Sequence, residues 1–269
     1  MAFFDHGGDR YYYFDAGAGA PVLLLHGLSN TGRAWAPQLV EMLRLGHRVI
    51  VPDLLGHGAS GPVKRTFTAY EQGQATLALL EFLGLESAAF VGLSLGGMVA
   101  LEVAAMSPDA VDKLVVAGTF RTMATPNRQQ MLDAWIEALR QSDGCLKRFK
   151  SSWTDLVGSV FADSSLGMTW YQAWHAQAAT QDADNLINWC EGMKSYDLGQ
   201  KLRLITAPTL VLAGATDPIS PISEAQGVAD QIRSAMVDVV PGGGHVFNVS
   251  SANEFSHRIN DFLQENRHG

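Results

Sequence analysis

Short apolar runs that end in glycine or aspartate recur along the chain and constrain its fold more than any other feature. They are residues 21–27 (PVLLLHG), 48–54 (RVIVPDL), 88–94 (AAFVGLS), 113–119 (KLVVAGT) and 209–214 (TLVLAG). The runs are apolar throughout instead of alternating, which is typical of strands covered by helices on both faces. Helical stretches with apolar residues three and four apart lie between them, at 35–45, 69–83 and 95–106. Strands that alternate with helices predict a mostly parallel sheet with right-handed crossovers.

Three further elements complete this pattern at the two ends of the chain. Residues 11–14 predict an antiparallel strand near the sheet edge, and residues 236–240 predict a late strand. Residues 252–266 predict a closing helix.

The middle of the chain departs from this alternation. Residues 121–204 contain helical stretches at 128–141 and 168–179 but no further apolar run of the strand type. We therefore expect an α/β core formed by residues 1–120 and 205–269, with residues 121–204 forming a helical cap over one end of the sheet. Five of the six tryptophans lie in this insertion: Trp135, Trp153, Trp170, Trp174 and Trp189. They predict an aromatic substrate cavity under the cap, and the alternative for each is that it only packs the cap onto the core.

Composition narrows the class of protein. The 269 residues carry a formal net charge of −8, which argues against nucleic acid or an anionic membrane as a partner. The two cysteines, Cys145 and Cys190, form neither a disulfide framework nor a metal-binding spacing. The chain shows no signal-peptide pattern at its start and no apolar run long enough to span a membrane. We expect a cytoplasmic protein with reduced cysteines and no bound metal.

The strongest local motif is residues 92–96 (GLSLG), which follow a predicted strand and open a predicted helix. A sharp turn between strand and helix needs small residues on both sides of its central residue. Such a turn holds the Ser94 hydroxyl above the carboxyl ends of the strands, at the positive end of the helix dipole. The motif therefore predicts a nucleophilic serine, and the alternative is a glycine-rich loop that only lets the helix pack closely.

A serine nucleophile needs a base and an acid that orients the base. His245 follows a strand and a glycine-rich turn and precedes the last helix, so we expect it to reach Ser94 as the general base. Asp217 lies on the loop after the strand 209–214, where it can accept the Nδ1 proton of His245. The main rival acid is Asp53, which we interpret as a loop residue that binds backbone amides.

An acyl-transfer site also needs two donors for the developing oxyanion. The backbone N–H groups of Leu28 and Leu95 are the predicted pair, since one follows the strand 22–25 and the other follows Ser94. His26 is expected to shape the Leu28 loop, not to take part in the chemistry.

These landmarks together resemble the α/β-hydrolase superfamily. They are His26-Gly27, the segment from Pro52 to Ser60, residues 92–96, the turn from Gly214 to Asp217, and Gly244-His245. The resemblance implies an α/β fold with an eight-stranded, mostly parallel sheet, helices on both faces and a helical cap after the sixth strand. It also implies that no cofactor is needed. Haloalkane dehalogenases and epoxide hydrolases carry an aspartate nucleophile where this chain has Ser94. The chain therefore departs from the pattern of those two groups.

Within the superfamily, residues 56–60 and 90–98 are most similar to the 3-oxoadipate enol-lactonases and small bacterial esterases. The sequence predicts a serine hydrolase for a small carboxylic ester or lactone. Two alternatives stay open: carbon–carbon bond hydrolysis of a vinylogous diketone, and a non-hydrolytic receptor that uses the cap cavity. A small molecule is the expected partner, and a homo-oligomer is compatible with the sequence. Arg121, where the cap begins, is a candidate for binding a substrate carboxylate; otherwise it is a solvated surface residue.

Overall fold

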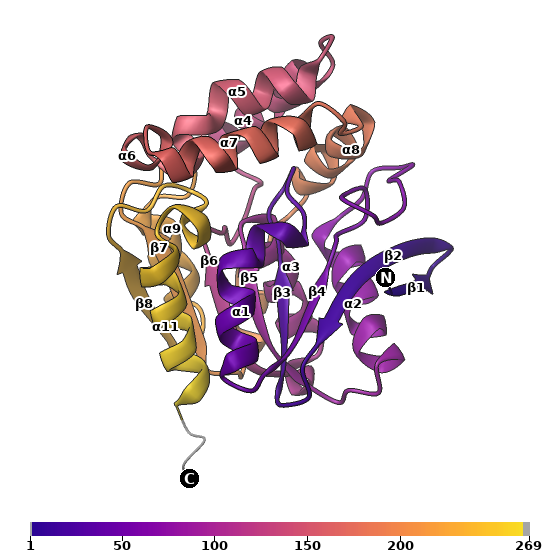
Figure 1. The fold of residues 1–269 in the computed structure, drawn as a ribbon. Coiled ribbons are helices and arrows are strands. Elements are labelled where there is room, and N and C mark those ends of the chain that lie inside the picture. The colour runs from indigo at the N-terminus through magenta and orange to yellow at the C-terminus, as the bar shows by residue number, and fades with distance from the viewer. Residues whose placement is uncertain (1, 266–269) are drawn as a thin grey trace.

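The computed structural model describes residues 2–265 and has an eight-stranded sheet at its centre (Figure 1). The strand order is β1-β2-β4-β3-β5-β6-β7-β8. The strands are β1 (Ala2–His6), β2 (Asp9–Ala16), β3 (Pro21–Leu25), β4 (Arg48–Pro52), β5 (Ala88–Leu93), β6 (Val111–Ala117), β7 (Thr209–Gly214) and β8 (Ala235–Val240). The strands from β4 to β8 in this order are parallel, whereas β2 pairs antiparallel with both β1 and β4.

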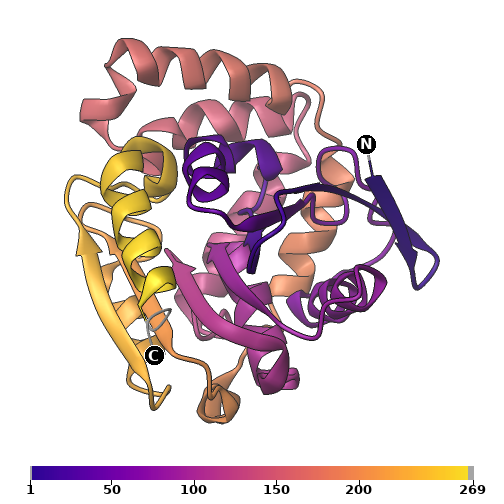
Figure 2. The same ribbon diagram turned by 60° about the horizontal axis from the view of Figure 1, so that its bottom comes forward.

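The predicted antiparallel strand near the sheet edge is confirmed as β2, which extends beyond residues 11–14 at both ends. The edge strand itself, β1, was not predicted, and it folds back on β2 as a hairpin. Figure 2 shows this hairpin projecting from one side of the molecule. Gly7 and Gly8 form the turn with φ angles of 62° and 86°, which glycine adopts without steric cost. The β1 sequence, AFFDH, is too short an apolar run to be predicted as the other strands were.

Helices cover both faces of the sheet, as the apolar runs predicted. Alternate residues of β3 point to opposite faces: Leu23 and Leu25 join the apolar cluster of α2 and α3, whereas Val22 and Leu24 join that of α1 and α11. The core helices are α1 (Ala36–Arg44), α2 (Ala69–Phe82), α3 (Leu95–Met106), α9 (Ile222–Ala229), α10 (Phe247–Ser250) and α11 (Ala252–Gln264). Asn266, the expected end of the closing helix, lies outside the described residues.

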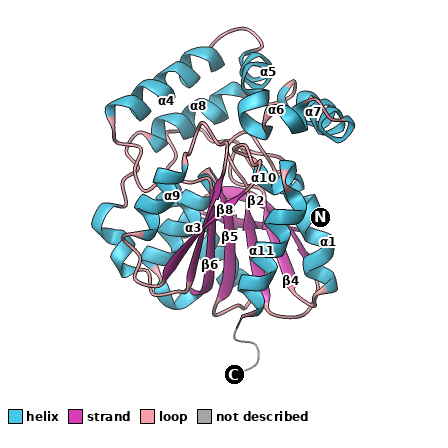
Figure 3. Cartoon of the chain, turned by 90° about the vertical axis from the view of Figure 1, so that its left-hand side faces the viewer, coloured by secondary structure: helices cyan, strands magenta, loops and turns pink. Residues whose placement is uncertain are grey.

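Between β6 and β7, after the sixth strand, the chain forms a helical layer over the carboxyl ends of the strands (Figures 1 and 3). Its helices are α4 (Pro126–Leu139), α5 (Gly144–Val157), α6 (Ser159–Ala162), α7 (Ser165–Ala178) and α8 (Ala183–Met193). The helices α4 and α8 extend one apolar cluster of the core, and α5 and α7 extend the other. The division into core and cap domains stays a prediction, and here "cap" means this helical layer.

None of the helices in residues 2–265 has both the length and the apolar character that crossing a membrane requires.

Candidate active site

Ser94 lies at the tight turn between β5 and α3, with a φ of 53° that non-glycine residues rarely adopt. Its backbone N–H donates to the Ala117 carbonyl of the neighbouring strand at 2.8 Å. A Cβ on Gly96 would lie 2.0 Å from the Leu25 carbonyl oxygen, so only glycine lets the helix begin this close to β3. The predicted turn is therefore present, and it stores backbone strain at the residue that carries the hydroxyl.

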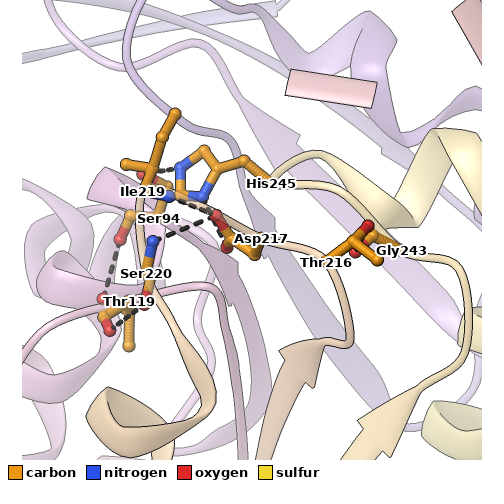
Figure 4. A network of polar contacts seen from close by, with 8 residues as sticks. All are labelled: Ser94, Thr119, Thr216, Asp217, Ile219, Ser220, Gly243 and His245. Atoms are coloured by element: carbon orange, nitrogen blue, oxygen red, sulfur yellow. Dashed lines mark hydrogen bonds and ion pairs between the residues drawn. The ribbon is translucent and has the colours of Figure 1, made fainter. Parts of the chain in front are cut away.

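Three side chains distant in sequence form one hydrogen-bonded chain at this turn (Figure 4). His245 Nε2 lies 2.9 Å from Ser94 Oγ, and His245 Nδ1 lies 2.8 Å from Asp217 Oδ2. A carboxylate accepts only, so Nδ1 carries the proton and Nε2 is left to accept the serine O–H. Asp217 and His245 are each 5% exposed, which shields their hydrogen bond from solvent.

The Asp217 carboxylate is held by its own loop. Its Oδ1 accepts the backbone N–H groups of Ile219 at 2.8 Å and Ser220 at 3.0 Å, which leaves Oδ2 for the histidine. The Ser220 hydroxyl donates to the Thr119 carbonyl, and the Thr119 hydroxyl donates to the Ser94 carbonyl. These bonds tie the aspartate loop to the serine turn, as Figure 4 shows.

The His245 loop is joined to both the core and the cap. The backbone N–H and the hydroxyl of Thr216 both donate to the Gly243 carbonyl, at 2.9 and 3.0 Å. On the cap side, the N–H groups of His245 and Val246 donate to carbonyls at the end of α5, and the second of these bonds measures 2.6 Å. The position of the imidazole therefore depends on the seating of α5.

The two predicted oxyanion donors lie on either side of Ser94. Leu95 is the first residue of α3, and Leu28 lies in the loop after β3. A Cβ on Gly27, next to Leu28, would lie 3.4 Å from the Ser94 Cβ, so this loop passes directly over the serine. Within residues 2–265, neither the Leu28 N–H nor the Leu95 N–H has a backbone acceptor, and both residues line the cavity with Ser94.

Two buried histidines fix the Leu28 loop. His26 Nδ1 donates to the Gly27 carbonyl at 2.9 Å, and its Nε2 accepts the Leu54 N–H at 3.0 Å. His57 Nε2 accepts the Ser29 N–H at 3.1 Å. Burial lowers the pKa of His26 to about 4 and, with a smaller effect of His26, the pKa of His57 to about 3. Both rings are therefore neutral acceptors at neutral pH, and His26 has the loop-shaping position expected from sequence.

Asp53, the rival acid, binds loop amides, whereas the carboxylate bonded to His245 is that of Asp217. Asp53 Oδ1 accepts the Gly32 N–H at 2.8 Å and its Oδ2 accepts the Ala59 N–H at 2.9 Å. Both oxygens are thus used to hold loops, as the sequence interpretation of this residue expected.

A cavity of about 70 Å³ lies between Ser94 and the cap. Its walls are mostly apolar, and two of the five candidate tryptophans, Trp135 and Trp174, line it.

The other three candidate tryptophans do not line the cavity, so the prediction that they contact substrate is corrected. Trp189 is fully buried, where its Nε1–H donates to the Leu55 carbonyl at 2.8 Å. Trp153 and Trp170 pack edge-on against Trp174, with ring centroids 5.9 and 5.5 Å away. These three rings attach or stiffen the cap.

The prediction for Arg121 is also corrected. Its side chain is exposed and lies over α9, with Nε 3.6 Å from where a Cβ on Gly227 would be, and it is absent from the cavity wall.

The cation at the cavity is Arg148 on α5, which the sequence reasoning missed. One face of this helix supplies the cavity-lining residues Cys145, Arg148, Phe149, Ser152 and Leu156. An arginine on the otherwise apolar face of an amphipathic helix was the available signal.

No trio of histidine, cysteine or acidic side chains in the described part of the chain is arranged to hold a metal ion. Cys145 and Cys190 are both free thiols and both buried.

An eight-stranded, mostly parallel sheet with a helical layer after its sixth strand, and a serine at the turn after β5, define the α/β-hydrolase fold. The comparisons with known proteins agree, since the family model described as alpha/beta hydrolase fold matches residues 20–252. The chain therefore belongs to the α/β hydrolase fold family, and as a member of that family it is a hydrolase.

Its relatives differ in the reaction for which they are named. The chain is 28% identical to a Pseudomonas savastanoi protein named as a carbamate hydrolase, RutD, over 91% of this chain and 95% of that one. It is 28% identical to a 2-hydroxymuconate semialdehyde hydrolase from Pseudomonas sp. strain CF600, over 96% of this chain and 92% of that one. Among solved structures, an enol-lactonase from Burkholderia xenovorans superposes with a TM-score of 0.91 at 21% identity, covering 98% of this chain and all of that one.

Proposed function

We propose that this protein is a serine hydrolase that cleaves a small carboxylic ester or lactone through an acyl-enzyme. The observation that carries the proposal is the hydrogen-bonded chain from Ser94 through His245 to Asp217 at the floor of a closed-in cavity. A free serine hydroxyl is a weak nucleophile, and a hydrogen-bonded imidazole oriented by a buried carboxylate is the arrangement that activates it.

In the first half of the reaction, Ser94 Oγ attacks the substrate carbonyl while His245 Nε2 accepts the hydroxyl proton. The Asp217 carboxylate stabilises the imidazolium without itself becoming protonated. The amides of Leu28 and Leu95 bind the tetrahedral oxyanion, and each such donor contributes roughly 10² to 10³ in rate. His245 then gives its proton to the leaving alkoxide, and the acyl group stays on Ser94.

In the second half, water replaces the alcohol. His245 takes a proton from the water, the hydroxide attacks the acyl carbonyl, and the same two amides bind the second oxyanion. Collapse of this intermediate releases the carboxylic acid and returns the proton to Ser94. The two halves need no group beyond these five residues and water, and a small molecule is the proposed partner.

The direct test is ester turnover by Ser94→Ala. Replacement of the nucleophile is expected to lower kcat by up to about 10⁶ in serine hydrolases. A set of short-chain methyl esters and lactones, followed by pH-stat, would measure it, with circular dichroism and Tm to show that the variant is folded. Near-normal turnover by folded Ser94→Ala would overturn the proposal. Wild-type protein that binds these compounds and turns over none would identify a receptor instead.

A second candidate reaction is favoured by one relative. The 28% identity to a 2-hydroxymuconate semialdehyde hydrolase supports carbon–carbon cleavage of a vinylogous diketone ring-fission product by the same three side chains. A ring-fission product assayed beside the ester set separates the two: the preferred substrate is the one with the larger kcat/KM.

A further inference from the structure

Arg148 projects from α5 of the cap toward the loop that holds Leu28. Its Nη1 lies 3.3 Å from the Ser29 hydroxyl oxygen. Its guanidinium carbon lies 4.4 Å from the centroid of the Trp135 ring. Both of these contacts are with residues of the cavity wall, so the charged end of Arg148 faces the cavity.

The guanidinium has no counter-charge. Within residues 2–265, no carboxylate lies within ion-pair distance of Arg148, and its Nε is buried without a hydrogen-bond acceptor. Two other partly buried arginines are paired: Arg48 with Asp15, at 2.7 Å, and Arg128 with Glu224. Burial also lowers the pKa of Arg148 below its ordinary value, although an arginine stays charged at neutral pH.

The cavity wall supplies no opposite charge to Arg148. No acidic side chain is among the described residues that line the cavity, and most of the wall is leucine, methionine, phenylalanine and tryptophan. Arg148 is partly buried. Removing even part of a charge from water without a partner is costly, so an uncompensated cation in such a place is rarely retained for stability alone. An aromatic ring and one hydroxyl supply only part of what the guanidinium loses on burial.

The loop beneath Arg148 is held in place by other groups. The amide nitrogens of Gln177 and Gln181 both donate to the Ser29 carbonyl, at 2.8 and 2.9 Å. His57 accepts the Ser29 N–H. Ser29 is thereby fixed at a φ of 64°, with its hydroxyl on Arg148 and its neighbour Leu28 beside Ser94. The cation and the proposed oxyanion donor are consequently held by one short segment.

From this geometry we infer that the substrate carries a free carboxylate, which the Arg148 guanidinium binds while the scissile carbonyl lies against Ser94. A carboxylate accepts two parallel hydrogen bonds from a guanidinium and supplies the missing counter-charge. Arg148 is thus a specificity-determining residue, and neutral esters of the same size lack its contribution. This inference rests on the proposed function, because it assigns the substrate class of that same site.

The kinetic test uses esters that differ only by a carboxylate in place of a methyl group. One series compares monomethyl esters of three- to six-carbon dicarboxylic acids with methyl alkanoates of equal chain length. A second pair moves the charge to the alcohol side, as O-acetylglycolate against ethyl acetate. Arg148→Gln is expected to raise KM for the preferred charged ester by about 10- to 100-fold, the range for a charged hydrogen bond. KM for its neutral partner is expected to change less than about threefold.

Two control variants make this result specific. Arg148→Lys keeps the charge without the planar fork and should recover part of the lost affinity. Arg121→Gln removes an exposed cation over α9 and should leave KM unchanged for both the charged and the neutral ester. Wild-type protein with equal KM for charged and neutral esters in both series would overturn the inference, as would an Arg148→Gln variant that loses both equally.

A binding measurement separates failure of this inference from failure of the proposed function. In Ser94→Ala protein, calorimetry with the preferred charged ester is expected to give a Kd about 10- to 100-fold lower than in the Ser94→Ala, Arg148→Gln double variant. Binding that depends on Arg148 without ester turnover by the wild type would uphold the anion site and overturn the hydrolase mechanism. Turnover with no dependence of either Kd or KM on Arg148 would uphold the hydrolase mechanism and overturn the anion site.

Discussion

The floor and the roof of the cavity are built differently. On the floor, at the carboxyl edge of the sheet, every side chain of the Ser94–His245–Asp217 chain has a defined hydrogen-bond partner within 3.0 Å. On the roof, the cap helices supply apolar walls and one cation without a counter-charge, Arg148. The hydrogen bonds of the floor are satisfied within the protein, whereas Arg148 in the roof has no counter-charge there. We interpret the floor as the source of the chemistry and the roof as the source of selectivity.

The largest effect is expected from a substitution of Asp217, in the floor of the cavity. Asp217→Asn keeps an acceptor for the Ile219 and Ser220 amides but removes the charge that fixes the His245 tautomer. By the known effect of such a change in serine proteases, kcat is expected to fall by roughly 10⁴. Stopped-assay rates on the preferred ester measure it.

Asp53→Asn is the matched control for that variant, since Asp53 is the other loop aspartate after a parallel strand. It holds the Gly32 and Ala59 amides and lies outside the proposed reaction. We expect it to lower Tm while the folded fraction keeps kcat within about tenfold. Equal losses of kcat in the two variants would contradict the separate roles assigned to the two aspartates.

The floor also has a stability that depends on pH, through His26 and His57. Their pKa values of about 4 and about 3 lie below the ordinary 6.5. Between these values and 6.5, the two histidines are protonated in the unfolded chain but neutral in the folded chain. Their contribution to the free energy of unfolding is full above pH 6.5 and is lost as the pH falls from 6.5 toward 4 for His26 and toward 3 for His57. For His57 the loss is on the order of 4 kcal/mol over that window.

Urea unfolding at pH 7.5, 6, 5 and 4.5 measures this loss, with His57→Gln for comparison. Glutamine can accept the Ser29 N–H but does not titrate. The plot of the free energy of unfolding against pH should therefore be shallower for the variant, by the equivalent of about one bound proton. Identical pH slopes for wild type and variant would show that His57 titrates in the folded protein as it does in the unfolded chain.

The smallest effect expected concerns the roof. Arg148→Met keeps much of the apolar stem but removes the uncompensated charge, so Tm in the absence of substrate should rise by about 2–4 °C. Differential scanning calorimetry measures the change. A drop of similar size would show that the Trp135 and Ser29 contacts stabilise Arg148 more than burial destabilises it, and would weaken the contrast between roof and floor.

The sequence predicted the floor better than the roof for a physical reason. Residues 92–96, Asp217 and His245 follow strands whose continuous apolar runs are local signals, and parallel strands bring their carboxyl ends to one edge. The turn at Ser94 is specified by glycines within two residues of it. The structure accordingly places these three side chains within hydrogen-bond distance, and the predicted sheet and its covering helices are confirmed.

The roof depends on the rotation of each cap helix about its axis and on its seating against the core. Amphipathic spacing indicates which face of a helix is buried, but not whether that face borders the cavity. Arg121 follows the sixth strand but turns outward over α9, whereas Arg148, distant from any strand, faces the cavity. Trp153 and Trp189 are as aromatic as Trp135, yet neighbouring rings and backbone bury them away from the cavity. The edge strand β1 was missed because its residues lack a continuous apolar run.

Activation of Ser94 can be detected by mass spectrometry of the protein after reaction with a fluorophosphonate, which modifies a serine only where a neighbouring base activates it. Activation of Ser94 by His245 predicts one adduct per chain, on the peptide that contains Ser94, and protection by the preferred ester. It also predicts no adduct in folded His245→Ala. A wild-type protein left unlabelled at Ser94, or labelled equally well without His245, would contradict that claim.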